Sequence, residues 1–316
     1  MRAVYYERFG GADVLTVGDL PDPEPGPGEV LIALQATSVN PIDWKIREGL
    51  FECVFDHRFP IVPGWDAAGT VAAVGAGVEG LAVGQAVYAY CRKPVAHEGT
   101  YAEYVTMPAD AVAPAPASLT AEQAAAIPLC ALTCWQSLVD FGQVQAGDSV
   151  LIHAGAGGVG SLGIQLAKHL GARVLTTASA RNADYVTGLG ADLVVDYTRQ
   201  DYRAAVRAAA PDGVDMILDG VGGTIPAESL ELIRGGGGLA CLNEPPDEAA
   251  AASRGIRTAR IYAEPNGAQL GEIAKLIDAG ALRPPAIDTL PLARAAEAMA
   301  RSQTGHVRGK LVLHIG

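Results

Sequence analysis

A glycine-rich turn between a short apolar run and a helical stretch constrains the fold of this chain more than any other feature. The run SVLIHA leads into GAGGVG, in which three glycines match the pattern GxGxxG. Between a strand and a helix, the first glycine permits a tight turn, the second admits a pyrophosphate close to the backbone, and the third lets helix and strand pack. The N–H groups at the helix start attract phosphate. Unless the turn is glycine-rich for packing alone, the residues expected to bind a dinucleotide are Gly155, Gly157, Gly158, Val159 and Gly160.

The residues after the next expected strand indicate which dinucleotide is bound. Roughly 20 residues beyond the turn, an Asp or Glu usually binds the ribose 2′-hydroxyl of NAD. This chain has Ser179 and Arg181 there instead. A carboxylate would repel a 2′-phosphate, whereas a hydroxyl and a guanidinium would hold it, so we expect NADPH. The alternative is that Arg181 is a solvated residue at a helix start, and Asp184 follows closely.

Two kinds of hydrophobic pattern divide the chain. Residues 1 to about 117 contain short runs such as EVLIALQATSV and AVYAY, separated by Gly and Pro, which favours a small antiparallel barrel or sandwich. A capping box from Thr120 to Gln123 then begins a helix. From residue 148 onward, short apolar runs alternate with helical stretches, as in a parallel, doubly wound sheet. The expected fold class is α/β, with a Rossmann sheet and a second, β-rich domain.

Charge and cysteine content exclude several classes of partner and site. The formal net charge is −12 with no cluster of Lys and Arg, which argues against nucleic acid and against an anionic membrane. Apolar residues make up 49% of the chain, enough for a sizeable core. Five cysteines without a CxxC indicate neither a disulfide framework nor a zinc knuckle. The start of the chain has no apolar signal region, so we expect a cytoplasmic protein without a membrane span.

Six segments carry a resemblance that extends over essentially the whole chain. They are, in order, SVNPIDWKIREG, FPIVPGWDAAGTVAAVG, GTYAEYV, LTCW, GAGGVG and GHVRGKLVL. Together they resemble the medium-chain dehydrogenase/reductase superfamily, and within it the zinc-independent quinone oxidoreductase and enone reductase branch. The resemblance implies a GroES-like catalytic domain of residues 1–118 and 264–316 and a Rossmann domain of residues 119–263. It also implies a homodimer that pairs through the edge of the Rossmann sheet, where TARIYAE would be the last strand.

The resemblance also bears on metal binding. The alcohol dehydrogenase branch holds a catalytic zinc with a Cys, a His–Glu pair and a second Cys. The matching positions here are Asn40, Trp65, Asp66 and a position near Leu129. Trp does not bind zinc and Asn is a poor ligand for it, so we expect no metal. Without a Lewis acid, hydride transfer favours acceptors that delocalise their own charge, such as quinones and α,β-unsaturated carbonyls.

Three residues are candidates for the substrate side, namely Asn40, Lys45 and Thr133. Asn40 would hydrogen-bond the substrate or the cofactor ribose. Lys45 would polarise the acceptor carbonyl as an enolate develops, and enone reductases with a similar NPxDxKxR segment have a lysine there. Some quinone oxidoreductases instead have tyrosines that match Lys45 and Phe51, so this sequence favours enone reduction. The alternatives for Lys45 are a solvated surface lysine or an ion pair with Asp43.

The resemblance assigns two more residues to the cofactor. Tyr197, in VVDYT, is expected beside the adenosine phosphate, unless it is an ordinary aromatic at a strand end, and Asn243 is expected near the nicotinamide ribose. The leading hypothesis is an NADPH-dependent reductase of a small-molecule quinone or enone. The alternatives are a non-catalytic NADPH-binding sensor or structural protein of the same fold, and an alcohol dehydrogenase with an unusual metal site.

Overall fold

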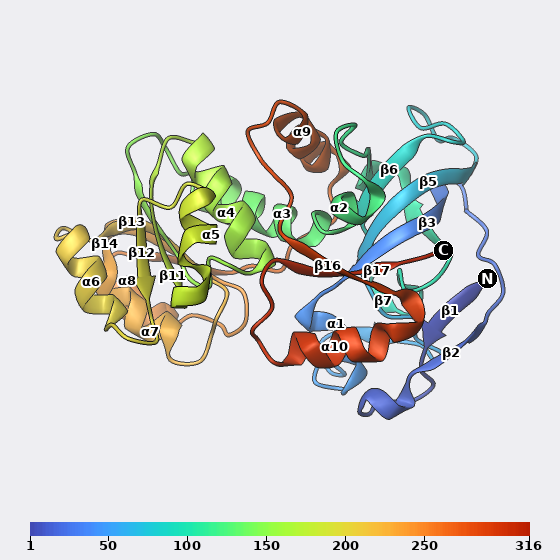
Figure 1. The fold of residues 1–316 in the computed structure, drawn as a ribbon, viewed down its shortest axis with the longest axis horizontal. Coiled ribbons are helices and arrows are strands. Elements are labelled where there is room, and N and C mark those ends of the chain that lie inside the picture. Colours follow the sequence, from blue (N-terminus) through green and yellow to red (C-terminus); the bar gives the residue numbers. More distant parts are fainter. The chain divides into compact units, whose positions relative to one another are not determined.

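The computed structural model describes all 316 residues, and the chain forms two compact units (Figure 1). The first unit consists of Met1–Leu129, Glu264–Gly280 and Pro284–Gly316. The second unit consists of Cys130–Ala263 with the short segment Ala281–Arg283. Both ends of the chain therefore belong to the first unit, and the second is built almost entirely from the middle.

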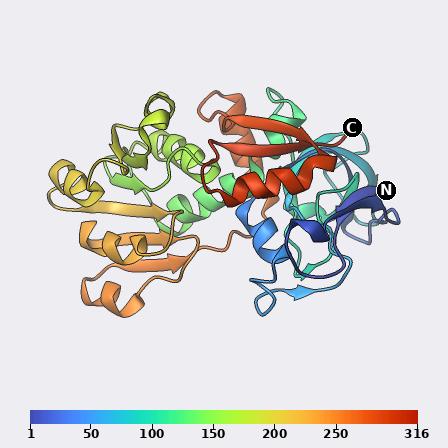
Figure 2. The same cartoon turned by 60° about the horizontal axis from the view of Figure 1, so that its bottom comes forward.

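A seven-stranded sheet forms the framework of the first unit (Figure 2). Its strands are β3 (Glu29–Val39), β5 (Asp66–Val74), β6 (Ala86–Tyr90), β8 (Tyr104–Pro108), β9 (Val112–Pro114), β16 (Ile287–Pro291) and β17 (Lys310–His314). The strand order is β16-β17-β3-β5-β6-β9, and β8 pairs with β3. Two small pairs lie outside this sheet: β1 (Arg2–Tyr5) with β2 (Thr16–Asp19), and β4 (Asp56–His57) with β7 (Val95–Ala96).

Four helices accompany this sheet, and one of them, α2, lies where the sequence expected the second domain to begin. They are α1 (Pro41–Arg47), α2 (Ala121–Ala125), α9 (Gly267–Asp278) and α10 (Ala295–Gln303). Helix α2 begins at the expected capping box, where the Gln123 N–H donates to Thr120 Oγ1 at 3.3 Å. The sequence assigned residues 119–129 to the second domain. In the structure α2 packs on β3 and β5, and these residues group with the first unit.

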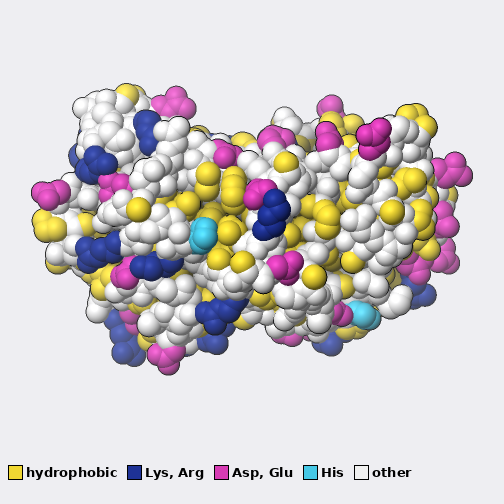
Figure 3. Space-filling view, turned by 90° about the horizontal axis from the view of Figure 1, so that it is seen from above, with side chains coloured by type: hydrophobic (Ala, Val, Ile, Leu, Met, Phe, Trp, Pro, Cys, Tyr) yellow, Lys and Arg dark blue, Asp and Glu magenta, His cyan; other side chains and the backbone are white.

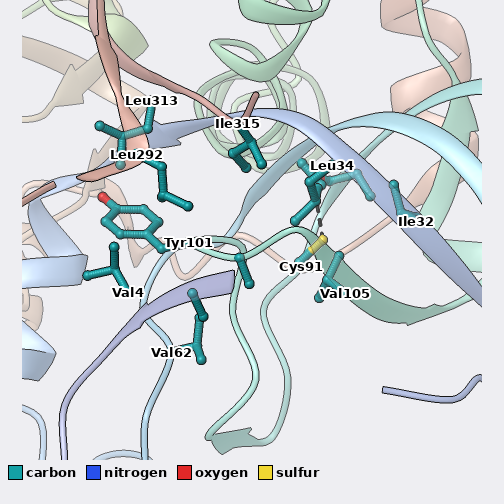
Figure 4. Packing of buried hydrophobic residues seen from close by; sticks show 14 of the residues in the cluster. Val4, Ile32, Leu34, Val62, Cys91, Tyr101, Val105, Leu292, Leu313 and Ile315 are labelled. Carbon is teal, nitrogen blue, oxygen red and sulfur yellow. Dashed lines mark hydrogen bonds between the residues drawn. The ribbon is translucent and has the colours of Figure 1, made fainter. Parts of the chain in front are cut away.

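Apolar side chains from both ends of the chain fill the core of the first unit (Figure 4). Val4 and Ile32 come from N-terminal strands, whereas Leu313 and Ile315 come from the C-terminal end, and all four are buried. Antiparallel pairing of β17 with β3 brings these segments together. The two ends of the chain remove each other's apolar surface from water, which explains why a unit that is discontinuous in sequence is one compact body.

The second unit contains the parallel, doubly wound sheet that the sequence predicts. Its strands are β10 (Ser149–Ile152), β11 (Arg173–Ala178), β12 (Leu193–Asp196), β13 (Val214–Asp219), β14 (Ile233–Cys241) and β15 (Arg257–Arg260). All neighbours are parallel, and the order is β12-β11-β10-β13-β14-β15. Val150, Leu151 and Ile152 of β10 are all fully buried, as a central parallel strand covered on both faces requires.

From β10 the chain runs outward through β11 to β12, then crosses back to β13 on the other side of β10, and this reversal indicates where a ligand binds. In open α/β sheets, ligands bind beyond the carboxyl ends of the strands where the order reverses, which here is between β10 and β13. The helices of this unit are α3 (Pro128–Trp135, which begins in the first unit), α4 (Gly158–His169), α5 (Ala183–Gly188), α6 (Tyr202–Ala209), α7 (Ile225–Ser229) and α8 (Glu248–Ser253). None of the helices in the chain combines the length and apolar character needed to cross a membrane.

Candidate functional site

Two of the glycines in the expected turn are required by the fold itself. Strand β10 ends at Ile152, and α4 begins after Gly157. A β-carbon at Gly155 would overlap Oγ1 of Thr176, and one at Gly160 would overlap the carbonyl oxygen of Ala154. Any side chain at either position would therefore force strand and helix apart, as the pattern predicts.

Gly157 is different, because nothing in the protein requires a glycine there. Its backbone angles, φ −78° and ψ 177°, are open to any residue. A β-carbon would meet only the carbonyl oxygen of Ala154, at an ordinary 3.4 Å. The space beside Gly157, next to the N-terminus of a twelve-residue helix, is thus a cradle that a β-carbon would fill. A phosphate group fits such a cradle.

A buried histidine, to which sequence analysis assigned no role, supports the turn. His153 is 3% exposed, and its ring nitrogens lie 3.2 Å from Thr177 Oγ1 and 3.3 Å from Ser229 Oγ. Burial lowers the pKa of His153 to about 4. The same Thr177 hydroxyl accepts the N–H of Ala154 at 3.2 Å, and the Thr177 carbonyl accepts the N–H of Gly155 at 3.0 Å. A neutral His153 thus fixes the entrance of the turn.

The structure brings Ser179 and Tyr197 to one edge of the second unit. Ala178 at the end of β11 pairs with Asp196 at the end of β12. Ser179 therefore follows β11, and Tyr197 follows β12, at the same end of the sheet. The Tyr197 side chain is 50% exposed. Arg181 is exposed on the single turn that follows Ser179. All three residues lie at the carboxyl end of the parallel sheet, where the sequence expected the adenosine end of the cofactor.

One acidic residue lies at the same edge, but its charge is already compensated. Asp196 accepts hydrogen bonds from the Thr198 hydroxyl at 2.7 Å and the Thr198 N–H at 3.1 Å. The Thr198 hydroxyl is the main reason that the pKa of Asp196 lies below its usual value, and Arg199 is 3.8 Å away. Asp184 lies in the first turn of α5, with its side chain exposed.

Asn243 and Thr133 are held by the second unit in different ways. The Asn243 amide donates to the carbonyl oxygens of Gly220 at 3.0 Å and Val221 at 3.3 Å. It thereby fixes the loop that follows β13. The glycine turn follows the neighbouring strand β10, so the loop and the turn lie on either side of the point where the strand order reverses. Thr133 is buried in α3, where the neighbouring Cys134 thiol donates to the carbonyl oxygen of Val159 at 3.0 Å. This contact ties α3 to the first turn of α4.

In the first unit, the other predicted residues lie at the two ends of α1: Asn40 before its first turn and Lys45 in its last. Asn40 precedes the helix and is buried, with its Nδ2 donating to Oδ2 of Asp66 at 2.8 Å and its Oδ1 accepting from Lys310. Lys45 is half-buried on α1, with its ammonium 5.7 Å from the centre of the Trp44 ring. The side-chain amide of Asn40 therefore already has partners in the protein on both of its polar atoms.

A second carboxylate is buried in the same helix. Asp43 Oδ2 accepts the N–H of Asn40 at 2.8 Å and the hydroxyl of Tyr101 at 3.0 Å. Burial raises the pKa of Asp43 to about 7, although these hydrogen bonds and the Lys310 charge oppose the rise. Asp43 is thus a structural carboxyl at the first turn of the helix that carries Lys45.

An aromatic row lies just beyond α1. Phe51 stacks on Phe55 with ring centres 5.7 Å apart, Phe55 meets the edge of Trp65 at 5.7 Å, and Trp65 meets Tyr90 at 6.0 Å. Trp65 is 9% exposed, whereas Phe51 and Phe55 are half-buried. The structure thus places Trp65 in the core, with Phe51 nearer the surface.

The positions that match zinc ligands do not fit a zinc ion. The carboxylate of Asp66 accepts hydrogen bonds from Ser38, Asn40 and the N–H of Leu129. The other residue at the position of the His–Glu pair is Trp65. No three His, Cys, Asp or Glu side chains anywhere in the chain form a group that could hold a metal. A tryptophan ring and a primary amide supply no donor that zinc prefers, so no chemical step is assigned to a metal.

Comparison with known proteins identifies the family. Residues 26–117 match the family of alcohol dehydrogenase GroES-like domains, and residues 189–313 match the zinc-binding dehydrogenase family. The chain is 34% identical to the chloroplastic NADPH-dependent alkenal/one oxidoreductase of Arabidopsis thaliana, over 99% of this chain and 79% of that protein. The chain belongs to the medium-chain dehydrogenase/reductase superfamily. This confirms the family that the six sequence segments indicated, including its zinc-independent branch.

Other members of this superfamily support the same assignment. The 2-methylene-furan-3-one reductase of Solanum lycopersicum is 32% identical, over 99% of this chain and 79% of that protein. The solved quinone oxidoreductase from Coxiella burnetii superposes with a TM-score of 0.89 at 33% identity, covering 100% of this chain and 99% of that one. A mycobacterial protein solved in complex with NADPH gives a TM-score of 0.89 at 34% identity, with both chains fully covered. The GroES-like and Rossmann fold class is thereby confirmed.

Proposed function

We propose that this superfamily member is an NADPH-dependent reductase that transfers hydride to a quinone or to the C=C bond of an α,β-unsaturated carbonyl compound. The observation that carries the proposal is the cradle at Gly157, together with the residues after the next strand, β11. These are Ser179 and Arg181, where an NAD-binding protein usually has an acid. The relatives named as an alkenal/one oxidoreductase and a 2-methylene-furan-3-one reductase support the same substrate class.

The residues around the cradle fit NADPH by their chemistry. Backbone N–H groups at the start of α4 suit a pyrophosphate, while Ser179 and Arg181 offer a hydroxyl and a guanidinium for a 2′-phosphate. Tyr197, half exposed at the same edge, has a ring face to offer the adenosine end. When bound, NADPH supplies the hydride, and the protein holds it and excludes water.

On the substrate side we propose Lys45 as the residue that stabilises negative charge. Reduction of an enone or quinone places charge on the carbonyl oxygen, and a fixed cation near that oxygen lowers the barrier. Asn40 is hydrogen-bonded to Asp66 and Lys310. Its proposed role is therefore to fix the start of α1, the helix that carries Lys45. Thr133 stays a candidate hydroxyl in the second unit. Solvent is the proposed source of the proton, since no side chain is assigned to donate one.

Steady-state oxidation of NADPH and NADH with two acceptors tests the proposal. The acceptors are 1,4-benzoquinone and a simple enone, each with and without a metal chelator. We expect turnover that prefers NADPH and is insensitive to chelator, with the enone as the better acceptor. Preference for NADH would contradict the roles of Ser179 and Arg181. Tight NADPH binding without turnover of either acceptor would favour a non-catalytic NADPH-binding protein of this fold.

We further propose a homodimer that forms through β15. This strand ends the six-stranded sheet, so one of its edges has no partner strand within the chain. Such edges are paired or protected in native proteins. At its end the buried Nε of Arg260 lacks a hydrogen-bond partner, and Tyr262 is 39% exposed. An isologous partner strand would pair with this free edge and cover Tyr262.

A cytoplasmic location is also a proposal. All five cysteines are free, and four of them are buried, which suits a reducing compartment. On the face drawn in Figure 3, Lys and Arg side chains are scattered among Asp and Glu side chains. Fractionation of cells that express the tagged chain tests this location, and recovery with a membrane fraction would contradict it.

A further inference from the structure

A lysine is buried in the first unit beside the start of α1. Lys310, the first residue of β17, is 4% exposed, and the next three residues of the strand are buried and apolar. Its ammonium donates to the carbonyl oxygen of Val39 at 2.9 Å and to Oδ1 of Asn40, and it lies 3.6 Å from Oδ2 of Asp66. A buried ammonium is unfavourable unless such partners replace its water.

Asp66 completes a closed network around this ammonium. The fully buried carboxylate accepts hydrogen bonds from Ser38 Oγ at 2.5 Å, from Asn40 Nδ2 at 2.8 Å and from the N–H of Leu129 at 2.7 Å. Asn40 and Asp66, which match zinc-ligand positions of the alcohol dehydrogenase branch, are thereby joined to Leu129, near which the last ligand position falls. The ammonium of Lys310 is the cation that neutralises the Asp66 carboxylate here.

The network holds the two residues that lead into α1. Lys310 binds the carbonyl of Val39 and the side chain of Asn40, and the N–H of Asn40 donates to Asp43 in the first turn of the helix. Helix α1 has only seven residues, and helices of this length depend on contacts outside themselves. Lys45 lies in the last turn of this helix, two residues after Asp43 and two before Arg47.

The opposite end of α1 is fixed without Lys310. Arg47, the last residue of the helix, is 1% exposed, donates from Nε to the carbonyl oxygen of Gly10 at 3.1 Å and pairs with Glu48 at 2.6 Å. The N-terminal end is therefore the end whose position depends on the buried ammonium.

We propose that Lys310 is a positioning residue for the proposed reduction. By holding Val39 and Asn40, its ammonium sets where α1 begins. With Arg47 fixed at the other end, it thereby sets the direction of the helix that carries Lys45. This inference rests on the proposed function. Misplacement of a catalytic group by about 1 Å costs on the order of a hundredfold in rate, so a small movement of α1 is sufficient.

The first experiment compares Lys310→Met with Lys310→Arg in the full-length protein. The methionine variant keeps the length and loses the charge, so we expect a decrease in kcat with the enone of at least about tenfold. The Kd for NADPH should stay near the wild-type value, because the dinucleotide cradle belongs to the second unit. Lys310→Arg keeps a cation and should recover part of the lost kcat. Lys93→Met is the matched control, since Lys93 is also paired, with Glu98 at 2.5 Å, but its hydrogen bonds go to Glu98 and Thr106 and not to α1.

A double variant separates positioning from the burial of an unpaired charge. Lys310→Met leaves the Asp66 carboxylate without its cation, and such a change alone can impair folding. Asp66→Asn combined with Lys310→Met removes both charges, so we expect better folding than in the single variant but an equally low kcat. Wild-type kcat in the double variant would overturn the proposal.

Two further readouts test whether Lys310 acts through α1 and Lys45. Amide hydrogen exchange of residues 39–47 should be faster in Lys310→Met than in wild type and unchanged in Lys93→Met. In a Lys45→Met background, Lys310→Met should cause no additional loss of kcat. Full additivity, or wild-type exchange in this segment, would overturn the proposal. If wild type reduces no acceptor, the proposed function fails, and the exchange comparison still decides whether Lys310 positions α1.

Discussion

A β-carbon at position 160 would overlap the carbonyl oxygen of Ala154, so α4 can lie against the turn only if residue 160 is glycine. At position 157 the same carbonyl oxygen would be 3.4 Å from a β-carbon, an ordinary contact distance. One turn thus contains a glycine that the fold requires and a glycine that it does not. This difference separates the structural role of the motif from its proposed binding role.

Gly157→Ala should fold like wild type and bind NADPH weakly. The backbone angles at 157 suit alanine, but the new methyl group would occupy the space beside the helix start where a pyrophosphate approaches. We expect an unchanged Tm and a Kd for NADPH at least about tenfold higher, equivalent to about 1.4 kcal/mol, measured by fluorescence titration. Gly160→Ala is the control, and its Tm should fall without any ligand. Wild-type affinity in Gly157→Ala would contradict a phosphate site at this turn.

Arg181→Ala should reduce the preference for NADPH over NADH. A hydrogen bond between charged groups contributes about 1.5–3 kcal/mol, so the Kd for NADPH should rise about tenfold to a hundredfold, while the Kd for NADH stays constant. Arg199→Ala is the control, because Arg199 is another exposed arginine near this edge, 3.8 Å from Asp196. If the control loses as much NADPH affinity as Arg181→Ala, the effect is a general one of charge and the assignment of Arg181 is wrong.

Local signals made the second unit predictable from sequence. The turn from Gly155 to Gly160 lies between a run of apolar residues and an amphipathic stretch, and both neighbours are adjacent in the chain. The parallel sheet followed from the alternation of apolar and helical segments, and the order of its strands follows the usual pattern. Capping chemistry also predicted the start of α2 at Thr120.

Long-range contacts could not be predicted in this way. Lys310 and Asn40 are 270 positions apart, and nothing in the sequence near either residue indicates that they meet. The apolar neighbours of Lys310 in β17 were the only local sign that its side chain is buried. His153 was overlooked because a single histidine at a strand end has no distinctive pattern. Likewise, the capping box shows where α2 begins but not that α2 packs on β3. The domain boundary expected after residue 118 therefore differs from the boundary between the compact units, which follows Leu129.

The buried His153 should make the stability of the second unit depend on pH. Its pKa is about 4 in the folded protein, whereas an unperturbed histidine has a pKa of 6.5. Between these values the unfolded chain therefore binds more protons than the folded one, and stability falls as the pH decreases through this window, by roughly 3 kcal/mol at most. His153→Gln lacks this dependence, and the Tm difference between wild type and variant should be larger at pH 7.5 than at pH 5. His169→Gln, an exposed histidine on α4, should follow wild type at both pH values, and a constant difference for His153→Gln would contradict a buried neutral imidazole.

Thr258→Pro should convert the proposed dimer into a folded monomer. The N–H of Ile261 donates to Cys241 of β14 at 2.9 Å. Because successive N–H groups of a strand point to opposite sides, the N–H of Ala259 also faces β14, whereas that of Thr258 faces the free edge of β15. Proline is tolerated at such an outward position but removes the donor that a partner strand would use. Light scattering after size exclusion should give twice the 32.5 kDa chain mass for wild type and one chain mass for the variant.

Ala259→Pro is the matched control for this change, because it removes a donor from the intrachain ladder instead. It should lower the Tm, whereas Thr258→Pro should keep the wild-type Tm at low protein concentration. A monomeric wild type at micromolar concentration would contradict the homodimer. A dimeric Thr258→Pro protein would show that the chains pair through a surface other than the outer edge of β15, since an edge-to-edge sheet uses the main-chain donors of both strands.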